Sequence, residues 1–476
     1  MVANHYRVEE DLLGQKEVPV SAYYGIQTVR ARENFNITGY IINPELIVAI
    51  AQVKKAAALA NMEVERLDRT IGNAIVLAAD EIIEGKLHDQ FIVDPIQGGA
   101  GTSVNMNANE VIANRALEHL GREKGDYEVI HPNIHVNMAQ STNDAFPTAI
   151  HIATIRLIDQ LVQTLEALKE TFYNKGKEFD HIIKMGRTHL QDAVPIRLGQ
   201  EFQAYGRVLS RDIKRISNSL ESLFEVNLGA TAVGTGLNAD LSYMEKAVEL
   251  LREITEYPFR NAENLVDGTQ NTDAYTEVSS ALKICMVNMS KVANDLRLMA
   301  SGPRAGFAEI KLPARQPGSS IMPGKVNPVI CEVVNQVAFQ VIGNDQTISM
   351  ASEAGQFELN VMEPVLVFNL HQSLHMMNQV FDTFRKYCIE GIEANIDICK
   401  AYVDRSVGII TALNPHVGYK VATKVAKEAI ETGKSVREII LRDNILSEVA
   451  MDQILEPFEM TRPGIAGEAI QANSRK

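Results

Sequence analysis

The amino-acid sequence predicts a mainly α-helical protein whose long helices pack as a central bundle. Apolar residues recur at steps of three and four, and one such series continues into Phe172 a heptad later: Ile155, Ile158, Val162, Leu165. In the later part of the chain, nothing between residues 326 and 397 has the apolar pattern of a parallel sheet. The helical spacing of the apolar residues and the lack of a sheet pattern together favour a mainly helical fold.

The first part of the chain is predicted to hold loops followed by helices. Residues 7–40 are mixed and polar, so we expect loops with short extended pieces there. Residues 44–85 are rich in Ala, Leu, Ile, Glu and Lys, which favours two helices separated near residues 68–70. After a glycine-rich break, a run through Asn109 and Leu117 resumes the helical pattern.

The rest of the chain is predicted to be long helices. They are expected after Pro147 and in three further ranges: 199–227, 326–352 and 364–397. A stripe at helical spacing indicates bundle core, and not a cofactor site, at Cys285, Met289, Val292, Leu296 and Met299.

Length and pattern predict three domains. A chain of 476 residues exceeds the usual limit of a single hydrophobic core. We expect an N-terminal mixed and helical domain over 1–141, a central long-helix bundle over 142–397 and a small helical domain over 398–476.

Composition excludes several classes of partner. The formal net charge is −14 and there is no tract rich in Lys or Arg, which argues against a nucleic-acid or anionic-membrane surface. No apolar run reaches about 18 residues, and the N-terminus lacks an apolar signal region. Four cysteines without CxxC spacing are expected to be reduced thiols of a cytoplasmic protein: Cys285, Cys331, Cys388, Cys399.

The histidines do not predict a metal site. His131 and His135 are four residues apart, but Pro132 between them disfavours a shared helical face. We expect neither a bound catalytic metal nor another cofactor.

Two polar segments in the first half are candidates for ligand binding. Thr102 follows the glycine-rich segment 98–101, where backbone can approach a ligand closely, although a plain turn between helices is the alternative. Ser141, Thr142 and Asn143 stand together just before a long helix. One of them would suffice as an N-cap, whereas three neighbouring hydroxyl and amide groups also suit a carboxylate and an amine.

A third polar segment covers residues 184–192 and contains Thr188 and His189. A lone histidine is more often structural than functional. The adjacent Arg187 and Lys184 favour the functional interpretation. A further turn at 229–238 is glycine-rich, but it lacks the GK[ST] ending of a nucleotide loop, so we reject that function.

The fourth and most informative segment is Gly318–Pro328. Its glycines and proline keep Ser319 and Ser320 on a loop that can move and close over a small ligand. Lys325 and Asn327 then come just before a predicted helix start, where free N–H groups and the helix dipole favour an anion. A surface turn with a solvated lysine is the alternative for any one of these residues.

Over all its residues, Gly318–Pro328 resembles the signature of the fumarase/aspartase superfamily. The resemblance extends to the other polar segments, to the N-terminal region and to Leu413–Pro415. It implies a three-domain helical fold and a homotetramer around a twenty-helix core, with each active site shared by three subunits. It also implies a β-elimination that releases fumarate through an enediolate (aci-carboxylate), with Ser319 as general base.

The resemblance and the chemistry together assign the substrate-binding residues. Removing a proton beside a carboxylate places a second negative charge on it, so fixed donors must face that group. The expected cradle of the β-carboxylate is Thr102, Ser141, Thr142 and the loop around Ser319 and Ser320. The residues expected at the α-carboxylate are Thr188, Lys325 and Asn327. Asn143 and His189, with Thr102, are expected near the amine.

Within the superfamily, the sequence is more similar to the ammonia-lyase branch than to the hydratases. The similarity lies in Asp11–Gly14, Gln140–Asp144 and Asn327–Gln336, and in the absence of tryptophan. Cys331 is a departure, because the branch often carries proline there. L-aspartate is therefore the expected substrate, giving fumarate and ammonia, and fumarate hydratase is the alternative.

The sequence also disfavours two other classes of protein. A catalytically silent helical scaffold is disfavoured because Ser319, Lys325, Asn327 and His189 are all present. An acidic protein-binding module would leave the polar segments unexplained.

Overall fold

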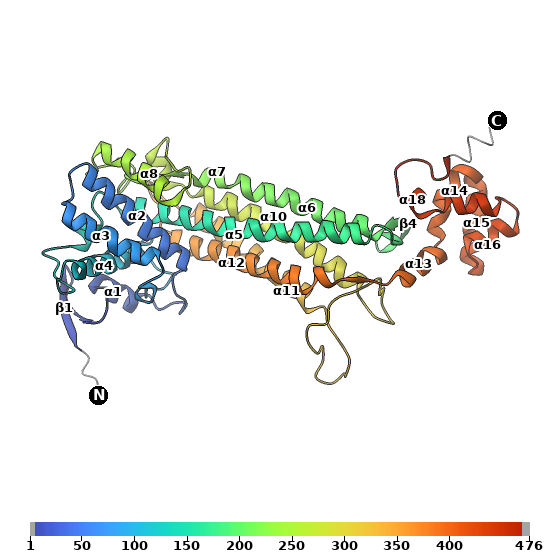
Figure 1. Ribbon diagram of the computed structural model, residues 1–476, viewed down its shortest axis with the longest axis horizontal. Helices are drawn as coiled ribbons and strands as arrows, with labels where there is room; N and C mark the ends of the chain where they lie inside the picture. The colour runs from blue at the N-terminus through green and yellow to red at the C-terminus, as the bar shows by residue number, and fades with distance from the viewer. Residues whose placement is uncertain (1–4, 469–476) are drawn as a thin grey trace. The chain divides into compact units, whose positions relative to one another are not determined.

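The computed structural model describes residues 5–468, and over this range it contains helices α1 to α18 and four two-stranded sheets. The mainly helical class is confirmed. Five helices have 21 to 37 residues (Figure 1): α5 Thr142–Glu178, α6 Leu198–Asn218, α10 Asp273–Met299, α11 Val329–Glu353 and α12 Glu363–Tyr387.

The chain forms two compact units, each assembled from three stretches of sequence. Unit 1 consists of Met1–Gln163, Asp212–Met286 and Val337–Asn378. Unit 2 consists of Thr164–Arg211, Val287–Gln336 and Gln379–Lys476. Each of the five long helices contributes one part to unit 1 and the other to unit 2.

Unit 1 begins with an antiparallel hairpin of β1 Tyr6–Asp11 and β2 Gly14–Pro19. Four helices follow: α1 Ile26–Asn34, α2 Pro44–Glu63, α3 Arg69–Ile83 and α4 Thr102–His119. The side chain of Asn43 caps α2, and that of Asp68 caps α3 by accepting from the Thr70 N–H at 2.8 Å. Two helices were predicted here with a break near residues 68–70, and α3 does begin there, whereas α2 ends earlier, at Glu63.

Helix α1 was not predicted, because its N-terminus depends on a distant residue. Glu110 of α4 is buried and accepts hydrogen bonds from the N–H groups of Gly25, Gln27 and Thr28 at 2.7–3.1 Å. Burial raises the pKa of Glu110 to about 7, although these hydrogen bonds oppose the shift. A carboxylate at the start of a helix also interacts favourably with its dipole.

The remainder of unit 1 contains short elements around the long helices. They are α7 Leu220–Leu223, β5 Glu225–Val226, α8 Leu241–Thr255, β6 Arg260–Asn261 and α9 Leu265–Gln270, and β5 pairs with β6 in parallel. Helix α8 packs against α2. The helix expected over 199–227 therefore ends earlier, at Asn218.

Helix α5 begins before Pro147, whereas the sequence placed its start after that proline. Pro147 lies inside the helix and has no N–H for the carbonyl of Asn143. The side chain of Asn227 supplies the missing donor, with its Nδ2 3.0 Å from that carbonyl oxygen. A residue remote in sequence thus allows proline within the helix.

Unit 2 contains the antiparallel hairpin of β3 Ile183–Thr188 and β4 Gln191–Arg197, where we had predicted only a polar segment between helices. A second, short sheet joins β7 Ile310–Lys311 to β8 Glu393–Ala394. Strand β8 lies in the range 364–397 that was expected to be continuous helix. Helix α12 ends ahead of it, at Tyr387.

The C-terminal helices of unit 2 build a small core of their own. They are α13 Ile396–Arg405, α14 Ile410–Val417, α15 Tyr419–Thr432, α16 Val436–Arg442, α17 Glu448–Ile454 and α18 Pro457–Met460. Leu413, Ile440, Met451 and Ile454 are fully buried in it. The end of the polar C-terminal tail lies outside the described residues.

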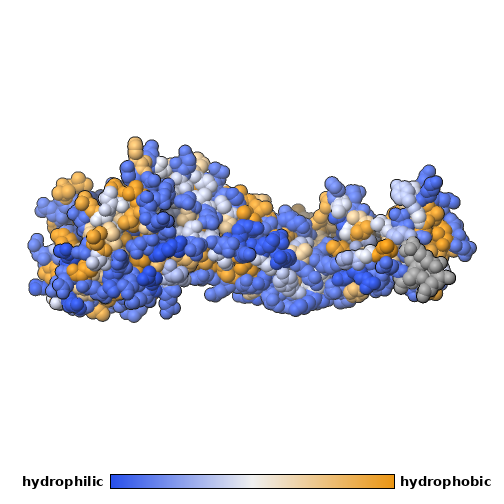
Figure 2. All heavy atoms as spheres, turned by 90° about the horizontal axis from the view of Figure 1, so that it is seen from above, coloured by the Kyte–Doolittle hydropathy of each residue, from blue (hydrophilic) through white to orange (hydrophobic). Residues whose placement is uncertain are grey.

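The surface in Figure 2 is mostly hydrophilic with separate hydrophobic patches, in keeping with the net charge of −14. Between residues 5 and 468, no helix has both the length and the apolarity needed to cross a membrane. All four cysteines are buried and unpaired by disulfides, as expected.

Candidate functional site

Thr102 opens helix α4 after a sharp turn. Gly99, Ala100 and Gly101 all have positive φ angles of 55–97°. A Cβ on Gly101 would lie 2.2 Å from the ring of Phe146, so only glycine fits there. The Thr102 side chain is exposed, and its hydroxyl donates to the carbonyl of Gly99 at 2.6 Å. The turn thus presents a threonine hydroxyl at a helix N-terminus.

Ser141, Thr142 and Asn143 form the start of helix α5. The Ser141 Oγ accepts from the Asn143 N–H at 3.2 Å, so the N-capping that the sequence allowed is present. The Thr142 hydroxyl is buried and accepts from Asn105 of α4 at 3.1 Å. This contact joins the α4 and α5 segments, so Thr102 and Ser141–Asn143 belong to one part of unit 1.

The glycine-rich turn 229–238 braces this helix start. Asp144 is buried; its Oδ1 accepts from the Ser141 N–H at 2.8 Å, and its Oδ2 accepts from Gly229 and Thr231 at 3.0 and 3.1 Å. Asn143 donates in turn to the carbonyl of Ala232 at 2.7 Å. The turn is therefore structural support for a polar segment, consistent with rejecting a nucleotide loop.

Sequence reasoning missed Lys54 of helix α2. Its side chain is fully buried, and its Nζ donates to Asn137 Oδ1 at 2.9 Å and to Gln140 Oε1 at 2.8 Å. Burial lowers the pKa of Lys54 to about 7, with the Asp144 carboxylate opposing the shift. Burial likewise raises the pKa of Asp144 to about 6. The sequence does contain a signal for the burial of Lys54, because this residue continues the apolar stripe of Ile47 and Ile50 at helical spacing.

Thr188 and His189 lie at the tip of the β3–β4 hairpin in unit 2. His189 and Leu190 are the two turn residues, with φ of 55° and 59°. Glycine or asparagine is usual at such positions, and other residues lose roughly 1–2 kcal/mol there. Backbone strain of this kind concentrates at functional sites. Both Thr188 and His189 are exposed, so the hairpin presents them outward.

Lys184 and Arg187, which had favoured a functional reading of this segment, hold the hairpin in place. Lys184 is buried, with its Nζ 3.0 Å from Glu201 and 3.2 Å from Glu309. Arg187 lies 2.8 Å from Glu309 and stacks on the ring of Phe307. Both cations are thus occupied within unit 2.

The loop Gly318–Pro328 closes on itself at its neck. The Gly318 N–H donates to the carbonyl of Lys325 at 2.7 Å, and Asn327 Nδ2 donates to the carbonyl of Gly318 at 2.8 Å. A Cβ on Gly318 would lie 2.6 Å from the Lys325 oxygen, so this neck requires glycine. Helix α11 begins directly after Pro328, close to the expected start.

Ser319 lies within this loop and accepts two backbone hydrogen bonds. The donors are the N–H groups of Ile321 and Met322, at 3.2 and 3.1 Å. An open hollow of about 450 Å³ is lined by Ser319, by the cations Arg315 and Lys325, and by their neighbours between 314 and 326. No acidic side chain is among these lining residues, so the hollow is suited to an anion. Ser320 is exposed on the same loop.

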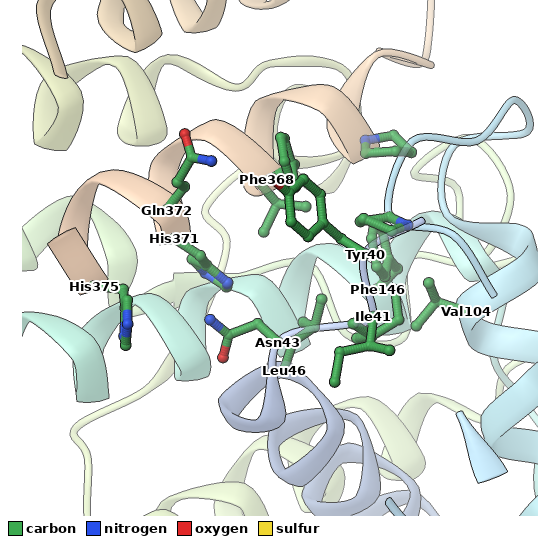
Figure 3. Close-up of a pocket in the computed structure, with 14 residues that line it drawn as sticks. Tyr40, Ile41, Asn43, Leu46, Val104, Phe146, Phe368, His371, Gln372 and His375 are labelled. Carbon is green, nitrogen blue, oxygen red and sulfur yellow. The ribbon is translucent and has the colours of Figure 1, made fainter. Parts of the chain in front are cut away.

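A second hollow, in unit 1, has a different character. Figure 3 shows Tyr40, Ile41 and Phe368 gathered around a pocket of about 200 Å³. His371 lies in its wall, buried, with Nε2 3.0 Å from the Thr154 hydroxyl, and burial lowers the pKa of His371 to about 3. A mostly apolar lining with a neutral histidine does not suit a dicarboxylate.

The sequence-predicted residues thus fall into two groups. Unit 1 holds Thr102, Ser141, Thr142 and Asn143, and unit 2 holds Thr188, His189, Ser319, Ser320, Lys325 and Asn327. In the order of the chain, Ser141 comes just before helix α5 and the β3–β4 hairpin comes after it. Within residues 5–468, no cluster of three or more His, Cys, Asp or Glu side chains is arranged to hold a metal.

The loop places a serine next to two cations and a helix start, an arrangement that suits the binding of a small anion. Comparison with known proteins identifies the family. Residues 14–343 match the Lyase family, and residues 409–462 match the Fumarase C C-terminus family. The chain belongs to the fumarase/aspartase superfamily of lyases.

Individual relatives cover nearly the whole chain. The aspartate ammonia-lyase of Bacillus subtilis is 66% identical over 98% of this chain and 98% of its own length. That of Escherichia coli is 51% identical over 97% of each chain. Among solved structures, fumarate lyase:delta crystallin from Brucella melitensis matches with a TM-score of 0.94 and 49% identity, over 96% of this chain and 100% of that one. Class II fumarase from Schistosoma mansoni matches with a TM-score of 0.90 and 35% identity over the same shares.

Proposed function

We propose that the protein is an aspartate ammonia-lyase, which converts L-aspartate reversibly to fumarate and ammonia. The observation that carries this is the 66% identity to the Bacillus subtilis aspartate ammonia-lyase over 98% of both chains. The residues of the loop are compatible with this reaction, since elimination from a dicarboxylate needs a base next to cations that hold the substrate.

Ser319 is the proposed general base. A serine hydroxyl gives up its proton reluctantly, so its alkoxide must be stabilised. The N–H groups of Ile321 and Met322 already point at Ser319 Oγ, and Lys325 lines the same hollow. These donors favour the charged form of the oxygen. Closure of the loop over substrate would exclude water and strengthen the effect.

The reaction then proceeds in two steps. Ser319 takes a proton from the β-carbon, and the C–H electron pair moves into the adjacent carboxylate to give an enediolate (aci-carboxylate). This pair returns to form the C=C bond of fumarate while the C–N bond breaks and ammonia leaves with its electron pair. The second charge develops on the β-carboxylate, so donors aimed at this group lower the barrier.

The other residues divide between the two carboxylates and the amine. The β-carboxylate is assigned to Thr102, Ser141, Thr142 and Ser320. The α-carboxylate is assigned to Thr188, Lys325 and Asn327. Asn143 and His189, with Thr102, face the amine. Among the β-carboxylate residues, Thr142 stands apart because its hydroxyl is buried and accepts a hydrogen bond from Asn105.

A complete site needs more than one chain in this proposal. The two groups of residues belong to different units of the chain, and closed symmetric association would bring groups from different copies together. In unit 1, Phe339 and Met350 of α11 are 66% and 64% exposed, which leaves apolar surface for neighbouring copies to cover. We therefore propose a homotetramer whose active sites each take residues from three subunits around a twenty-helix core.

Two further parts of the proposal concern organisation. The domain boundaries at 141/142 and 397/398 remain as proposed from the sequence. A cytoplasmic location fits the four buried free cysteines, since thiols persist in a reducing compartment.

The test follows fumarate by its ultraviolet absorbance with L-aspartate and, separately, L-malate. The expected result is fumarate from L-aspartate alone; fumarate from L-malate alone would make the protein a hydratase. Ser319→Ala is expected to lower kcat by about 10²–10⁴-fold. Ser320→Ala, the matched comparison on the next residue, keeps the base and removes one donor to the β-carboxylate, so it is expected to lower kcat by a much smaller factor than Ser319→Ala. Unchanged turnover in Ser319→Ala would refute the base assignment, and light scattering that gives a monomer would refute the shared site.

A further inference from the structure

Two thiols meet at the base of the loop. Cys331 is the third residue of α11, and Cys388 directly follows the last residue of α12. Their Sγ atoms lie 3.6 Å apart, and both residues are buried, with 0% and 1% of their surface exposed. Cys399, by contrast, contacts a backbone carbonyl, that of Glu309, at 3.5 Å. Cys331 and Cys388 are therefore a chemically distinct pair.

The spacing suits a reversible covalent bond. Sulfur atoms in a disulfide are about 2.0 Å apart, so 3.6 Å is contact without a bond. The two residues are 57 positions apart in sequence, and they come together because the start of α11 meets the end of α12 in unit 2. A disulfide here would fasten these two helix ends to each other.

The pair lies next to the loop in both sequence and space. Cys331 follows Asn327 by four residues, and the Asn327 side chain closes the loop neck at Gly318. A cavity of about 10 Å³, about the room of one water, is lined by both cysteines, Arg315 and Tyr387. The guanidinium of Arg315 lies 4.2 Å from the Tyr387 ring centre. Arg315 also lines the hollow of Ser319, so one side chain borders the thiols and the candidate site.

We propose that Cys331 and Cys388 are a redox-active thiol pair, which a hydroperoxide oxidises to a disulfide that restrains the loop Gly318–Pro328. One sulfur attacks the peroxide oxygen and becomes a sulfenic acid, and the O–O bond breaks to release an alcohol or water. The second sulfur attacks the sulfenic sulfur, the S–O bond breaks, and water leaves. Two thiols lose two electrons and two protons, and the hydroperoxide gains both.

The surroundings set when the pair reacts. The Cys331 thiol and burial together raise the pKa of Cys388, so few thiolates form while the cavity is closed. Arg315 is exposed and Tyr387 is 43% exposed, so a peroxide reaches the sulfurs when this stacked pair moves aside. In a reducing compartment the resting form is the dithiol, and the disulfide is transient. The effect on activity rests on the proposed role of the loop, whereas the disulfide itself does not.

The experiment treats the full-length, folded protein with hydrogen peroxide, blocks free thiols, and digests it without reductant for mass spectrometry. The expected result is a disulfide-linked peptide pair containing Cys331 and Cys388. Cys331→Ala and Cys388→Ala are expected to lack it, and Cys285→Ala, the matched control at another buried thiol, to retain it. If one of the first two variants fails to fold, the other suffices. No linked pair in protein that stays folded by circular dichroism, or pairs involving Cys285 to the same extent, would overturn the proposal.

The second readout is fumarate formation from L-aspartate before and after treatment. Wild type is expected to lose activity several-fold and to recover with a thiol reductant, while Cys331→Ala does neither. Recovery with a thiol reductant distinguishes inactivation by the disulfide from inactivation by methionine sulfoxide, because methionine sulfoxide is reversed only by dedicated reductases. A disulfide without loss of activity would overturn the restraint of the loop. Activity of untreated wild type tests the proposed function independently.

Discussion

Replacing Lys54 by methionine should make the protein more stable at neutral pH and less active. Lys54 is fully buried in α2, and burial lowers its pKa from 10.5 to about 7. Methionine has a similar length and no charge, so Lys54→Met removes the penalty of burying an ammonium group. It also removes the donor that positions Gln140, the residue before Ser141.

The magnitude follows from the pKa and the partners. A shift from 10.5 to about 7, at 1.36 kcal/mol per unit, corresponds to roughly 3–5 kcal/mol between the two protonation states. Gln140 Oε1 loses its donor in the variant, at a cost of about 1–3 kcal/mol. Asn137 Oδ1 keeps two other donors, Asn105 and Asn109, both at 3.2 Å. The net expectation at pH 7 is a gain of about 1–3 kcal/mol.

The pH dependence has a definite sign. The folded-state pKa of Lys54 lies below the unfolded value, so between about pH 7 and 10.5 the unfolded chain holds a proton that the folded chain lacks. The unfolding free energy of wild type should therefore rise with pH in this window, by up to about 1.4 kcal/mol per pH unit relative to Lys54→Met. The difference in unfolding free energy that favours Lys54→Met over wild type should therefore shrink as the pH rises through this window.

The assay is urea unfolding at a fixed protein concentration and at several pH values between 7 and 9. Lys55→Met, on the next residue, is the matched control. The ammonium of Lys55 is partly exposed and lies 2.6 Å from Asp80. The unfolding free energy of Lys55→Met is expected to depend on pH as that of wild type does. Parallel curves for wild type and Lys54→Met across this range would refute the reasoning. Unchanged kcat in Lys54→Met would refute its positioning of Gln140.

Three further substitutions have definite expectations. Lys184→Met removes the cation shared by the buried Glu309 and the partly exposed Glu201, although Arg187 still pairs with Glu309, so it should lower the unfolding free energy by about 1–3 kcal/mol, measured in urea. Gly101→Ala places a Cβ against the ring of Phe146 at a φ of 87°, so a loss of about 1–3 kcal/mol is expected. Gly85→Ala, at φ 91° with open space around it, is the control and should lose only about 1 kcal/mol. His189→Ala removes an exposed side chain, so it should raise KM for L-aspartate without changing the melting temperature, and the reverse result would make His189 structural.

The contrast between α3 and α1 explains how far the sequence could be followed. Helix α3 begins at a residue capped by its own neighbour, Asp68, and such a signal is legible within a few positions. Helix α1 begins where a carboxylate 85 residues away accepts the N–H of Gly25. The same holds for Pro147, whose place inside α5 depends on Asn227. Boundaries set by remote partners leave no local trace.

The features of the candidate site also divide into those that local sequence predicts and those that depend on remote contacts. Loop Gly318–Pro328 was predicted because glycine, proline, hydroxyl and cation occur together within a few residues. The bracing of Asp144 and the burial of Lys54 were not, because Asp144 depends on the turn 229–238 and Lys54 on Gln140, far away in sequence. Lys184 and Arg187 had suggested chemistry, but Glu309, more than a hundred residues later, pairs with both.

By itself, the sequence determined the helical class, most of the long helices and the positions of the polar segments. These features are encoded locally, because helix periodicity, caps and turn residues act within a few positions. Tertiary structure alone decided which buried charges meet, why His189 sits at a strained hairpin tip, and that Cys331 touches Cys388. Those facts depend on which surfaces pack together, and packing joins residues that the linear order keeps apart.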